Sequence, residues 1–228
     1  MNTTISDSIN ISTKLSNANL NTNKINITIC PPSLYIAQVH QILKNSSLKI
    51  GAQNIYTQEE GAYTGEISAK MIADYCDTVI IGHSERRQIF KESNQDIKQK
   101  FLLAKKFNID SIICVGETIQ EHESGKAKNA ISTQILSALN SAPDLNQLMI
   151  AYEPVWAIGT GKAATSNDAQ NMCSYIRNVI AEISERNVAE KIPILYGGSV
   201  NSGNIEQFTN QQDINGALVG TASLDPDE

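Results

Sequence analysis

The chain has 228 residues and a net charge of −6, from 18 Lys and Arg against 24 Asp and Glu, and 41% of its residues are hydrophobic. An acidic chain is a poor partner for a nucleic-acid backbone or an anionic membrane surface, so we expect it to bind neither. No run approaches the roughly 18 consecutive apolar residues of a membrane helix, and the apolar content suffices for a large core.

Seven short apolar runs, typical of β-strands, follow one another along the chain. They begin at Ile25, Lys49, Asp77, Asp110, Leu148, Ile192 and Asn215. The stretches between them are long enough for helices, and apolar residues recur there at the helical period, as at Ile97, Phe101 and Ala104 or at Ile131, Ile135 and Leu139. Because no linker divides the chain, this alternation predicts one α/β domain with parallel strands over residues 1–228.

The ends of the later runs favour a closed (β/α)8 barrel over an open doubly wound sheet. Polar and glycine residues gather there in the segments GHSERR, VGET, YEP, YGGS and VGTAS. Barrel sites are built from the loops that follow the strands, whereas the G-x-G-x-x-G fingerprint of doubly wound nucleotide folds does not follow the first run. Seven runs are nevertheless one short of eight. The residues before the first run predict only a weak helix through Ile5, Ile9, Leu15 and Leu20.

Two residues at predicted strand ends are candidates for acid–base chemistry. Glu153 ends the run LMIAYE, where burial would make a carboxylate a stronger base, and a capping acid is the alternative interpretation. His83 lies at a strand end where an imidazole can polarise a carbonyl, and a histidine in a surface turn is the alternative. His40 and His122 fall on predicted helix or loop surfaces. The His, Cys and carboxylate residues show no metal-ligand spacing, so we expect no metal.

The segment PVWAIGTG, residues 154–161, is predicted to form a lid that excludes water, because rigid residues flank a small-residue tip. It is not a Walker A motif, since Trp156 stands where that motif needs its first glycine and Ala163 where it needs Ser or Thr. Glycine turns follow the last two strands at 197–199 and 220–221. Free N–H groups in such turns bind anions, and although each could be a tight turn only, together they suggest a phosphorylated ligand.

The cysteines predict the compartment. Cys30, Cys76, Cys114 and Cys173 are widely spaced and lie in apolar segments, as reduced and buried thiols do. The start MNTTISDSINIS has neither the basic nor the apolar region of a secretory signal. We therefore expect a cytoplasmic protein.

Eight motifs, taken in order along the chain, resemble those of the triosephosphate isomerase family. They are CPPSLY (30–35), GAQN (51–54), GAYTGE (61–66), IGHSERR (81–87), CVGE (114–117), AYEPVWAIGTG (151–161), YGGS (196–199) and LVGTASL (218–224). This resemblance covers nearly the whole chain. It implies a TIM barrel that interconverts dihydroxyacetone phosphate and D-glyceraldehyde 3-phosphate, in glycolysis and gluconeogenesis, without a cofactor.

The resemblance also implies roles for individual residues. Glu153 is the base that moves a proton between C1 and C2 of the substrate, and His83 is the neutral electrophile that stabilises the enediolate. Gly159, Ser199, Gly220 and Thr221 bind the phosphate, Thr221 through its backbone N–H in place of a usual glycine. The lid comprises Pro154, Val155, Trp156, Ala157, Ile158, Gly159, Thr160 and Gly161. Thr64 lies near the tip of a loop that inserts into a second subunit, which implies a homodimer.

The two ends of the sequence depart from the family. Its first strand carries N-x-K, which helps to bind the phosphate, whereas this sequence matches only from Met1 and stops at Glu228 before most of the last helix. We therefore expect a barrel shortened at both ends, and an isomerase weakened by the lack of that lysine, which neither Lys14 nor Lys24 replaces. The alternatives are a catalytically degenerate relative acting as a binding protein, and another phosphosugar isomerase or epimerase.

Overall fold

Seven parallel strands form one curled sheet in the computed structural model, which describes residues 1–18, 20–140, 142, 144–157 and 164–228. The strands are β1 (Thr28–Ile29), β2 (Lys49–Ala52), β3 (Thr78–Ile81), β4 (Asp110–Val115), β5 (Leu148–Tyr152), β6 (Ile194–Tyr196) and β7 (Gly216–Ala217). Each pairs in parallel with the next along the chain. This sequential order confirms the seven predicted strands and excludes a doubly wound sheet, whose strand order reverses.

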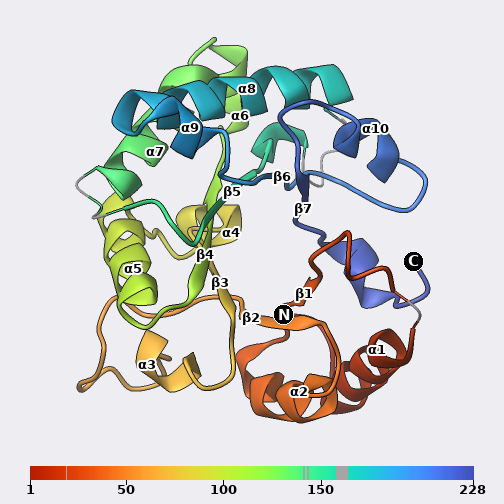
Figure 1. Cartoon of the computed structure of the whole chain (residues 1–228). Coiled ribbons are helices and arrows are strands. Elements are labelled where there is room, and N and C mark those ends of the chain that lie inside the picture. The colour runs from red at the N-terminus through yellow and green to blue at the C-terminus, as the bar shows by residue number, and fades with distance from the viewer. Residues whose placement is uncertain (19, 141, 143, 158–163) are drawn as a thin grey trace.

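Helices connect the strands and cover the outside of the sheet (Figure 1). They are α1 (Ile5–Asn17), α2 (Ile36–Leu43), α3 (Ala69–Ile72), α4 (Ser84–Gln88), α5 (Asn94–Lys106), α6 (Ile119–Glu123), α7 (Ala127–Leu139), α8 (Ser166–Ile183), α9 (Arg186–Ala189) and α10 (Ile205–Thr209), with short 3-10 turns η1 (Ser33–Tyr35), η2 (Val155–Ala157) and η3 (Thr221–Leu224). The predicted helical periods correspond to α5 and α7. Within the described ranges, no helix combines the length and apolar character needed to cross a bilayer.

The core has two layers, one on each face of the sheet. A small inner cluster consists of Ile80, Ile112, Cys114 and Ala151, which point to the inside of the curled sheet. A much larger outer cluster joins the sheet to the helices, with Ile113 and Ile150 among its fully buried members. Neighbouring residues of β4 thus fall in different layers, because successive side chains of a strand point to opposite faces.

The middle of the sheet is better paired than its ends. Strands β4 and β5 pair continuously from Ser111 with Leu148 to Val115 with Tyr152. By contrast, β1 and β7 are two residues long and lie at the two ends of the strand order, and no pairing joins them in the part of the chain that the structure describes. Helix α1 and the C-terminal residues lie beside each other (Figure 1), linked by an ion pair of 2.9 Å between Lys14 and Asp227.

Helix α1 begins at Ile5 as the sequence predicts but ends at Asn17, before Leu20, and within the helix only Leu15 of the predicted apolar face packs against the core. Ile5 and Ile9 are 52% and 37% exposed, whereas Ser8 and Ser12 are buried. The Ser12 hydroxyl donates to the carbonyl of Ser8 at 2.7 Å, so its polar group is satisfied within the helix. Small serines therefore allow α1 to pack closely against α2, the element that it contacts most.

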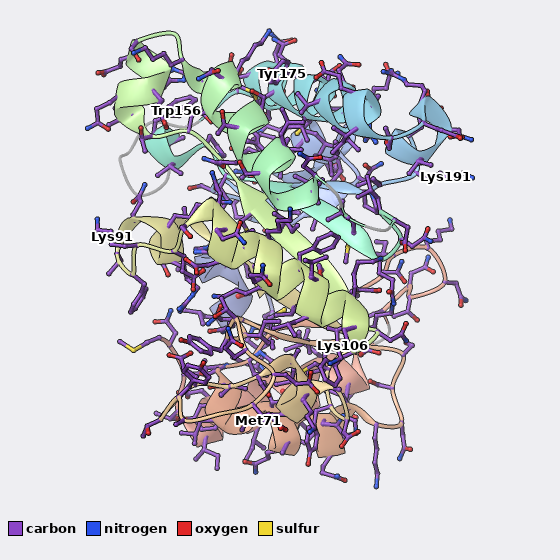
Figure 2. All side chains as sticks on the ribbon, turned by 90° about the vertical axis from the view of Figure 1, so that its left-hand side faces the viewer. Met71, Lys91, Lys106, Trp156, Tyr175 and Lys191 are labelled. Carbon is purple, nitrogen blue, oxygen red and sulfur yellow. The ribbon has the colours of Figure 1, made fainter. Side chains whose placement is uncertain are left out.

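The loops that follow the strands lie at one end of the molecule. Figure 2 looks onto α5 and α7, which pack against each other, and shows Lys91 and Trp156 on one side and Lys106 and Lys191 on the other. Lys91 and Trp156 follow β3 and β5, whereas Lys106 and Lys191 precede β4 and β6. The carboxyl ends of the strands therefore share one rim, which is where a barrel of this kind places its site.

Candidate active site

Two reactive side chains meet at the carboxyl ends of β3 and β5. His83 is separated from β3 by Gly82 alone, and Glu153 follows β5 directly. Because both strands pair with β4 in parallel, their ends reach the same rim of the sheet. The Nε2 atom of His83 lies 2.9 Å from Oε1 of Glu153. The structure thus brings together the two residues that the sequence singles out for acid–base chemistry.

Local backbone geometry orients the His83 ring. Gly82 has a φ of +71°, a left-handed conformation that glycine adopts readily, and it turns the chain out of β3. His83 then caps α4, where its Nδ1 accepts a hydrogen bond of 3.4 Å from the backbone N–H of Glu85. With Nδ1 as the acceptor, the proton of the neutral ring is on Nε2, the atom that faces Glu153.

Two opposing influences set the pKa of His83. Burial favours the neutral ring and lowers the pKa, but the hydrogen bond to Glu153 and the negative charges of Glu153 and Glu85 outweigh it. The pKa of His83 is therefore raised above its ordinary value of 6.5. In this arrangement the imidazolium form is stabilised by the carboxylate that it contacts.

Glu153 is only 2% exposed, yet its carboxylate is well supplied with donors. The backbone N–H of Ser84 donates to Oε2 at 2.9 Å, and the Ser84 hydroxyl lies 3.3 Å from Oε1 as a second donor. Without them, burial of a carboxylate would be costly. The end of β6 also leaves space for this side chain, because a Cβ at Gly197 would lie 3.0 Å from Glu153 Cγ.

The strand between the two residues, β4, is tied to the rim by Arg87. Its Nε donates to the carbonyl of Gly82 at 2.8 Å, and its Nη2 donates to the carbonyl of Cys114 at 2.9 Å. One guanidinium therefore joins the ends of β3 and β4. Burial raises the pKa of the Cys114 thiol well above its ordinary value, and the charge of Glu153 raises it further. Cys114 thus lies beside the carboxylate as a neutral thiol and is not a candidate nucleophile.

The first part of the predicted lid is anchored to a buried carboxylate, Glu117. Trp156 donates from Nε1 to Glu117 Oε1 at 2.7 Å, and the Tyr152 hydroxyl donates to the same oxygen at 3.1 Å. The His122 ring stacks on Trp156 with centroids 4.2 Å apart. Pro154, which begins the lid, precedes the turn η2. The remaining predicted lid residues, Ile158, Gly159, Thr160 and Gly161, lie outside the described residues.

The predicted phosphate-binding residues lie at the ends of the neighbouring strands. Ser199 follows β6, and Gly220 and Thr221 follow β7, so all three share the rim with Glu153. All three are exposed, and a Cβ at Gly220 would meet no atom within 4 Å. Within the described residues, no hydrogen bond or ion pair links them to His83 or Glu153. These three residues are therefore accessible to solvent.

The sequence of the chain matches a known family over its whole length. The sequence model of triosephosphate isomerase matches residues 1–228. The chain belongs to the triosephosphate isomerase family. A triosephosphate isomerase of Dehalococcoides mccartyi is 46% identical over 224 residues, 98% of this chain and 88% of the relative. Those of Natranaerobius thermophilus and Dictyoglomus turgidum are each 48% identical over 88% of this chain, and the matches cover 78% and 82% of these relatives.

Membership of the triosephosphate isomerase family makes the chain an aldose–ketose isomerase. The binding-protein interpretation is not favoured, because the matching relatives are named as enzymes over nearly the full length of the chain. The curled parallel sheet with flanking helices agrees with the TIM barrel that the sequence predicts. Of the two N-terminal lysines, Lys14 lies in the last turn of α1 and Lys24 in the turn that precedes β1, so neither stands at a strand end.

Sequence analysis missed several residues that shape this triosephosphate isomerase site. Ser84 holds the Glu153 carboxylate and was signalled only by its place beside His83 in GHSE. His122 lies exposed on helix α6, as the sequence predicts, and the structure adds that its ring stacks on Trp156. Gln134, which hydrogen-bonds the backbone of Gly116, gave no signal in the sequence, because its contact depends on the packing of α7 against β4. In the portions of the chain that are described, no group of three or more His, Cys, Asp or Glu residues could hold a metal ion.

Proposed function

We propose that this chain interconverts dihydroxyacetone phosphate and D-glyceraldehyde 3-phosphate, with Glu153 as the base and His83 as the electrophile. The observation that carries the proposal is the 2.9 Å contact between His83 Nε2 and Glu153 Oε1 at one rim of the sheet. A proton acceptor and a donor to a carbonyl oxygen are the two groups that an enolisation needs, and here they reach the same point.

In the proposed reaction Glu153 removes a proton from C1 of dihydroxyacetone phosphate. The electrons of that C–H bond form the C1–C2 double bond, and the former carbonyl oxygen becomes an enediolate oxygen to which His83 Nε2–H donates. The C2 oxygen takes the Nε2 proton of His83, and the same nitrogen then takes the proton of the C1 hydroxyl, so that the negative charge moves to the C1 oxygen. As that oxygen forms the aldehyde carbonyl, the electrons of the C1–C2 double bond take up at C2 the proton that Glu153 returns. A preorganised donor of this kind is most effective where charge develops in the transition state.

Substrate binding has to release Glu153 from its present partners. Its oxygens are engaged by His83 and by Ser84, so the carboxylate must exchange these contacts for the substrate. The exchange removes the hydrogen bond that raises the pKa of His83, and burial, which acts in the opposite direction, then favours the neutral imidazole. The same movement thereby frees the Glu153 carboxylate to act as the base and favours the neutral form of His83 that acts as the electrophile.

The phosphate is proposed to bind at Ser199, Gly220 and Thr221, together with Gly159 of the lid. Support comes from the exposure of Ser199, Gly220 and Thr221 on the rim beside Glu153. Backbone N–H groups of such turns attract anions without a buried cation. The lid from Pro154 to Gly161 is proposed to exclude water and to prevent phosphate loss from the enediolate.

Turnover of the two triose phosphates in a coupled assay tests this function directly. The parent chain is expected to convert both substrates, and Glu153→Asp, which withdraws the carboxylate by one methylene, is expected to lower kcat by about 100-fold or more. A parent without turnover, or a Glu153→Asp variant that is as active as the parent, would refute the assignment. Thr209→Ala, on the distant helix α10, serves as the matched control.

The chain is further proposed to act as a homodimer through the loop that contains Thr64. Residues 60–66 are exposed, yet the loop is braced by the rings of Tyr56 and Tyr63, which pack at a tilt of 49° with their centroids 4.8 Å apart. Figure 1 shows this orange segment between β2 and α3 on the outer side of the molecule. Exposed apolar side chains support an interface: Leu34 (82%), Ile89 (68%), Phe90 (63%) and Met71 (60%).

Sedimentation of the parent and of Thr64→Arg tests the dimer. We expect a dimeric parent and a monomeric variant, because a charged side chain at the loop tip would be buried without a partner. A monomeric parent at micromolar concentration would contradict the proposal.

A cytoplasmic location is also proposed, on the basis of free thiols. The four cysteines are unpaired, and burial raises the pKa of three of them to about 12. The four are Cys30, Cys76, Cys114 and Cys173, and the three are Cys30, Cys76 and Cys173.

A further inference from the structure

A glutamine side chain binds both polar backbone groups of one glycine beside the site. Gly116 follows β4, and its N–H donates to Gln134 Oε1 at 2.9 Å. The Gly116 carbonyl accepts from Gln134 Nε2, also at 2.9 Å. Gln134 lies on α7 and is partly buried. Because one backbone group donates and the other accepts, the orientation of the amide is fixed, and only an amide or a protonated carboxyl can make both bonds.

Gly116 packs tightly against the main chain of Glu153. A Cβ on Gly116 would lie 1.8 Å from the carbonyl oxygen of Glu153 and 2.8 Å from its carbonyl carbon. The regular ladder of β4 and β5 ends at Val115 with Tyr152, and the Glu153 N–H donates to the Val115 carbonyl at 2.8 Å. Gly116 therefore lies against Glu153 just beyond the paired strands, where the ladder no longer fixes its position.

The residue after Gly116 extends this contact to the lid. Glu117 accepts hydrogen bonds from Trp156 and Tyr152, which lie on either side of Glu153 in the sequence. Glycine has more backbone freedom than any other residue, so Gly116 would be poorly fixed without a partner for its polar groups. Gln134 supplies that partner from outside the sheet.

We propose that Gln134 is a positioning residue for Glu153, acting through the Gly116 backbone that its side-chain amide clamps between β4 and β5. It makes no contact with the reacting atoms. It holds the segment that supports the main chain of Glu153 on one side and the first turn of the lid on the other. The inference rests on the proposed isomerase function. In this proposal α7, a helix on the outside of the barrel, helps to align the base.

Two substitutions separate alignment from simple packing. Gln134→Met keeps the length and most of the volume of the side chain but removes both hydrogen bonds. Gln134→Glu keeps the acceptor for the Gly116 N–H, and it regains the donor for the Gly116 carbonyl only when the carboxyl is protonated. Thr133→Ala, at the exposed neighbouring position of α7, is the matched control.

We expect Gln134→Met to lower kcat by about 10- to 100-fold, as displacements of about 1 Å do, with KM within about threefold of the parent and Thr133→Ala unchanged. For Gln134→Glu, we expect the ratio of the variant's kcat to the parent's kcat, both measured at the same pH, to rise as the pH falls, because protonation restores the donor to the Gly116 carbonyl. A Gln134→Met variant with lowered Tm but parental kcat would overturn the proposal. If Gln134→Met fails to fold, a ratio for Gln134→Glu that does not change with pH overturns it instead.

The titration of His83, followed by NMR of its ring protons, distinguishes failure of this inference from failure of the proposed function. If the parent shows no turnover, the isomerase assignment fails, but the contact between His83 and Glu153 can still be measured. A displaced Glu153 should change the titration midpoint of His83 in Gln134→Met relative to the parent and to Thr133→Ala. Identical midpoints in all three proteins would show that Gln134 does not position Glu153.

Discussion

The two sides of the rim differ in how far the chain itself arranges them. On the side of β3 to β5, Glu153 is buried and already bound by His83 and Ser84. On the side of β6 and β7, Ser199 and Thr221 are exposed, and among the residues that the structure describes no hydrogen bond or ion pair joins them to His83 or Glu153. The groups proposed for proton transfer are therefore assembled before a substrate arrives, whereas those proposed for the phosphate await their ligand.

Elementary electrostatics accounts for this difference. A carboxylate taken out of water needs donors at once, so burial of Glu153 requires Ser84 and His83 close by. Backbone N–H groups that are to bind a phosphate must instead remain unpaired with the protein, and unpaired groups are tolerated only where water reaches them. The pairing of the strands follows the same division, since β4 and β5 are long and β7 has two residues.

The largest effect is expected on the buried side. Glu153→Gln removes the base but keeps an acceptor of similar size, and kcat should fall by about 1,000-fold, within the range for loss of a general base. KM should change little, because the exposed side is intact. Coupled turnover measurements give both constants. If KM rises by as large a factor as kcat falls, Glu153 also contributes to substrate binding, and the proposed division between a proton-transfer side and a phosphate-binding side is wrong.

The next effect is on the free energy of unfolding. It concerns an ion pair between α8 and the segment that precedes β7, below the exposed side of the rim. Arg177 Nε lies 2.6 Å from Asp213 Oδ1, and Nη1 donates to the carbonyls of Ala189 at 2.7 Å and Ile192 at 3.0 Å. Arg177→Met should lower the free energy of unfolding by about 3 kcal/mol, because Asp213 is left buried without its partner. Urea unfolding measures the change. A loss below about 1 kcal/mol would mean that the pair contributes little.

The same pair predicts a dependence of stability on acid. Burial raises the pKa of Asp213, but hydrogen bonds from Arg177 and Gln170 and the charge of Arg177 outweigh it, so the pKa lies below the ordinary 3.8. A carboxyl with a lowered pKa in the folded state adds stability above 3.8 and loses it as the pH falls through the folded value. Asp213→Asn should therefore flatten the acid limb of a plot of unfolding free energy against pH. An unchanged acid limb would contradict this cause.

A smaller effect is expected from the turn at Gly220 and Thr221, which is proposed to bind the phosphate. Thr221→Pro removes the backbone N–H, and KM should rise by about 10-fold or more, as for loss of a hydrogen bond to a charged group, with kcat within about threefold. Thr221→Gly keeps the N–H and should behave like the parent. Equal effects of the two substitutions would show that the side chain, and not the backbone, makes the contact.

The smallest effect is a shift in the titration of His83. The pKa of His83 is raised above 6.5 in the parent, where Glu153 and Glu85 face it. Glu153→Gln removes one charge while burial continues to favour the neutral ring, so the NMR midpoint should fall relative to the parent. Since the folded pKa is raised, His83 adds stability below pH 6.5 that is lost as the pH rises through the folded value. An unchanged midpoint would show that Glu153 does not set the charge of His83.

The features that could be predicted are those that short stretches of sequence determine. The seven strands and helices α5 and α7 follow from apolar runs and periods, and the placement of His83 and Glu153 follows from strand ends. The buried face of α1 could not be predicted, because Ser8 and Ser12 are buried and Ile5 is exposed. A helical period gives only a preferred side, and the shape of the neighbouring helix decides which residues fit.

Contacts between segments that are distant in the sequence could not be predicted either. Ser84 and Glu153 are 69 positions apart, and Gln134 reaches Gly116 across 18. The residues around a buried carboxylate are chosen by packing, and polar side chains such as Gln134 resemble ordinary helix surface until the helix is placed on the sheet. The strand ends pointed to the reactive pair and the family resemblance implied the role of each residue, whereas the groups that hold the pair in place came from the structure.

The stacking of Trp156 on His122 gives the chain its own optical probe. Trp156 is the single tryptophan of the sequence, and it lies in the turn η2, in the first part of the proposed lid. Indole emission responds to the polarity and to the quenching groups of its surroundings, and here these are the His122 ring and the Glu117 carboxylate. A movement of η2 away from these groups should therefore change the fluorescence of the unlabelled protein, so that rapid mixing with substrate tests whether the proposed lid moves and at what rate.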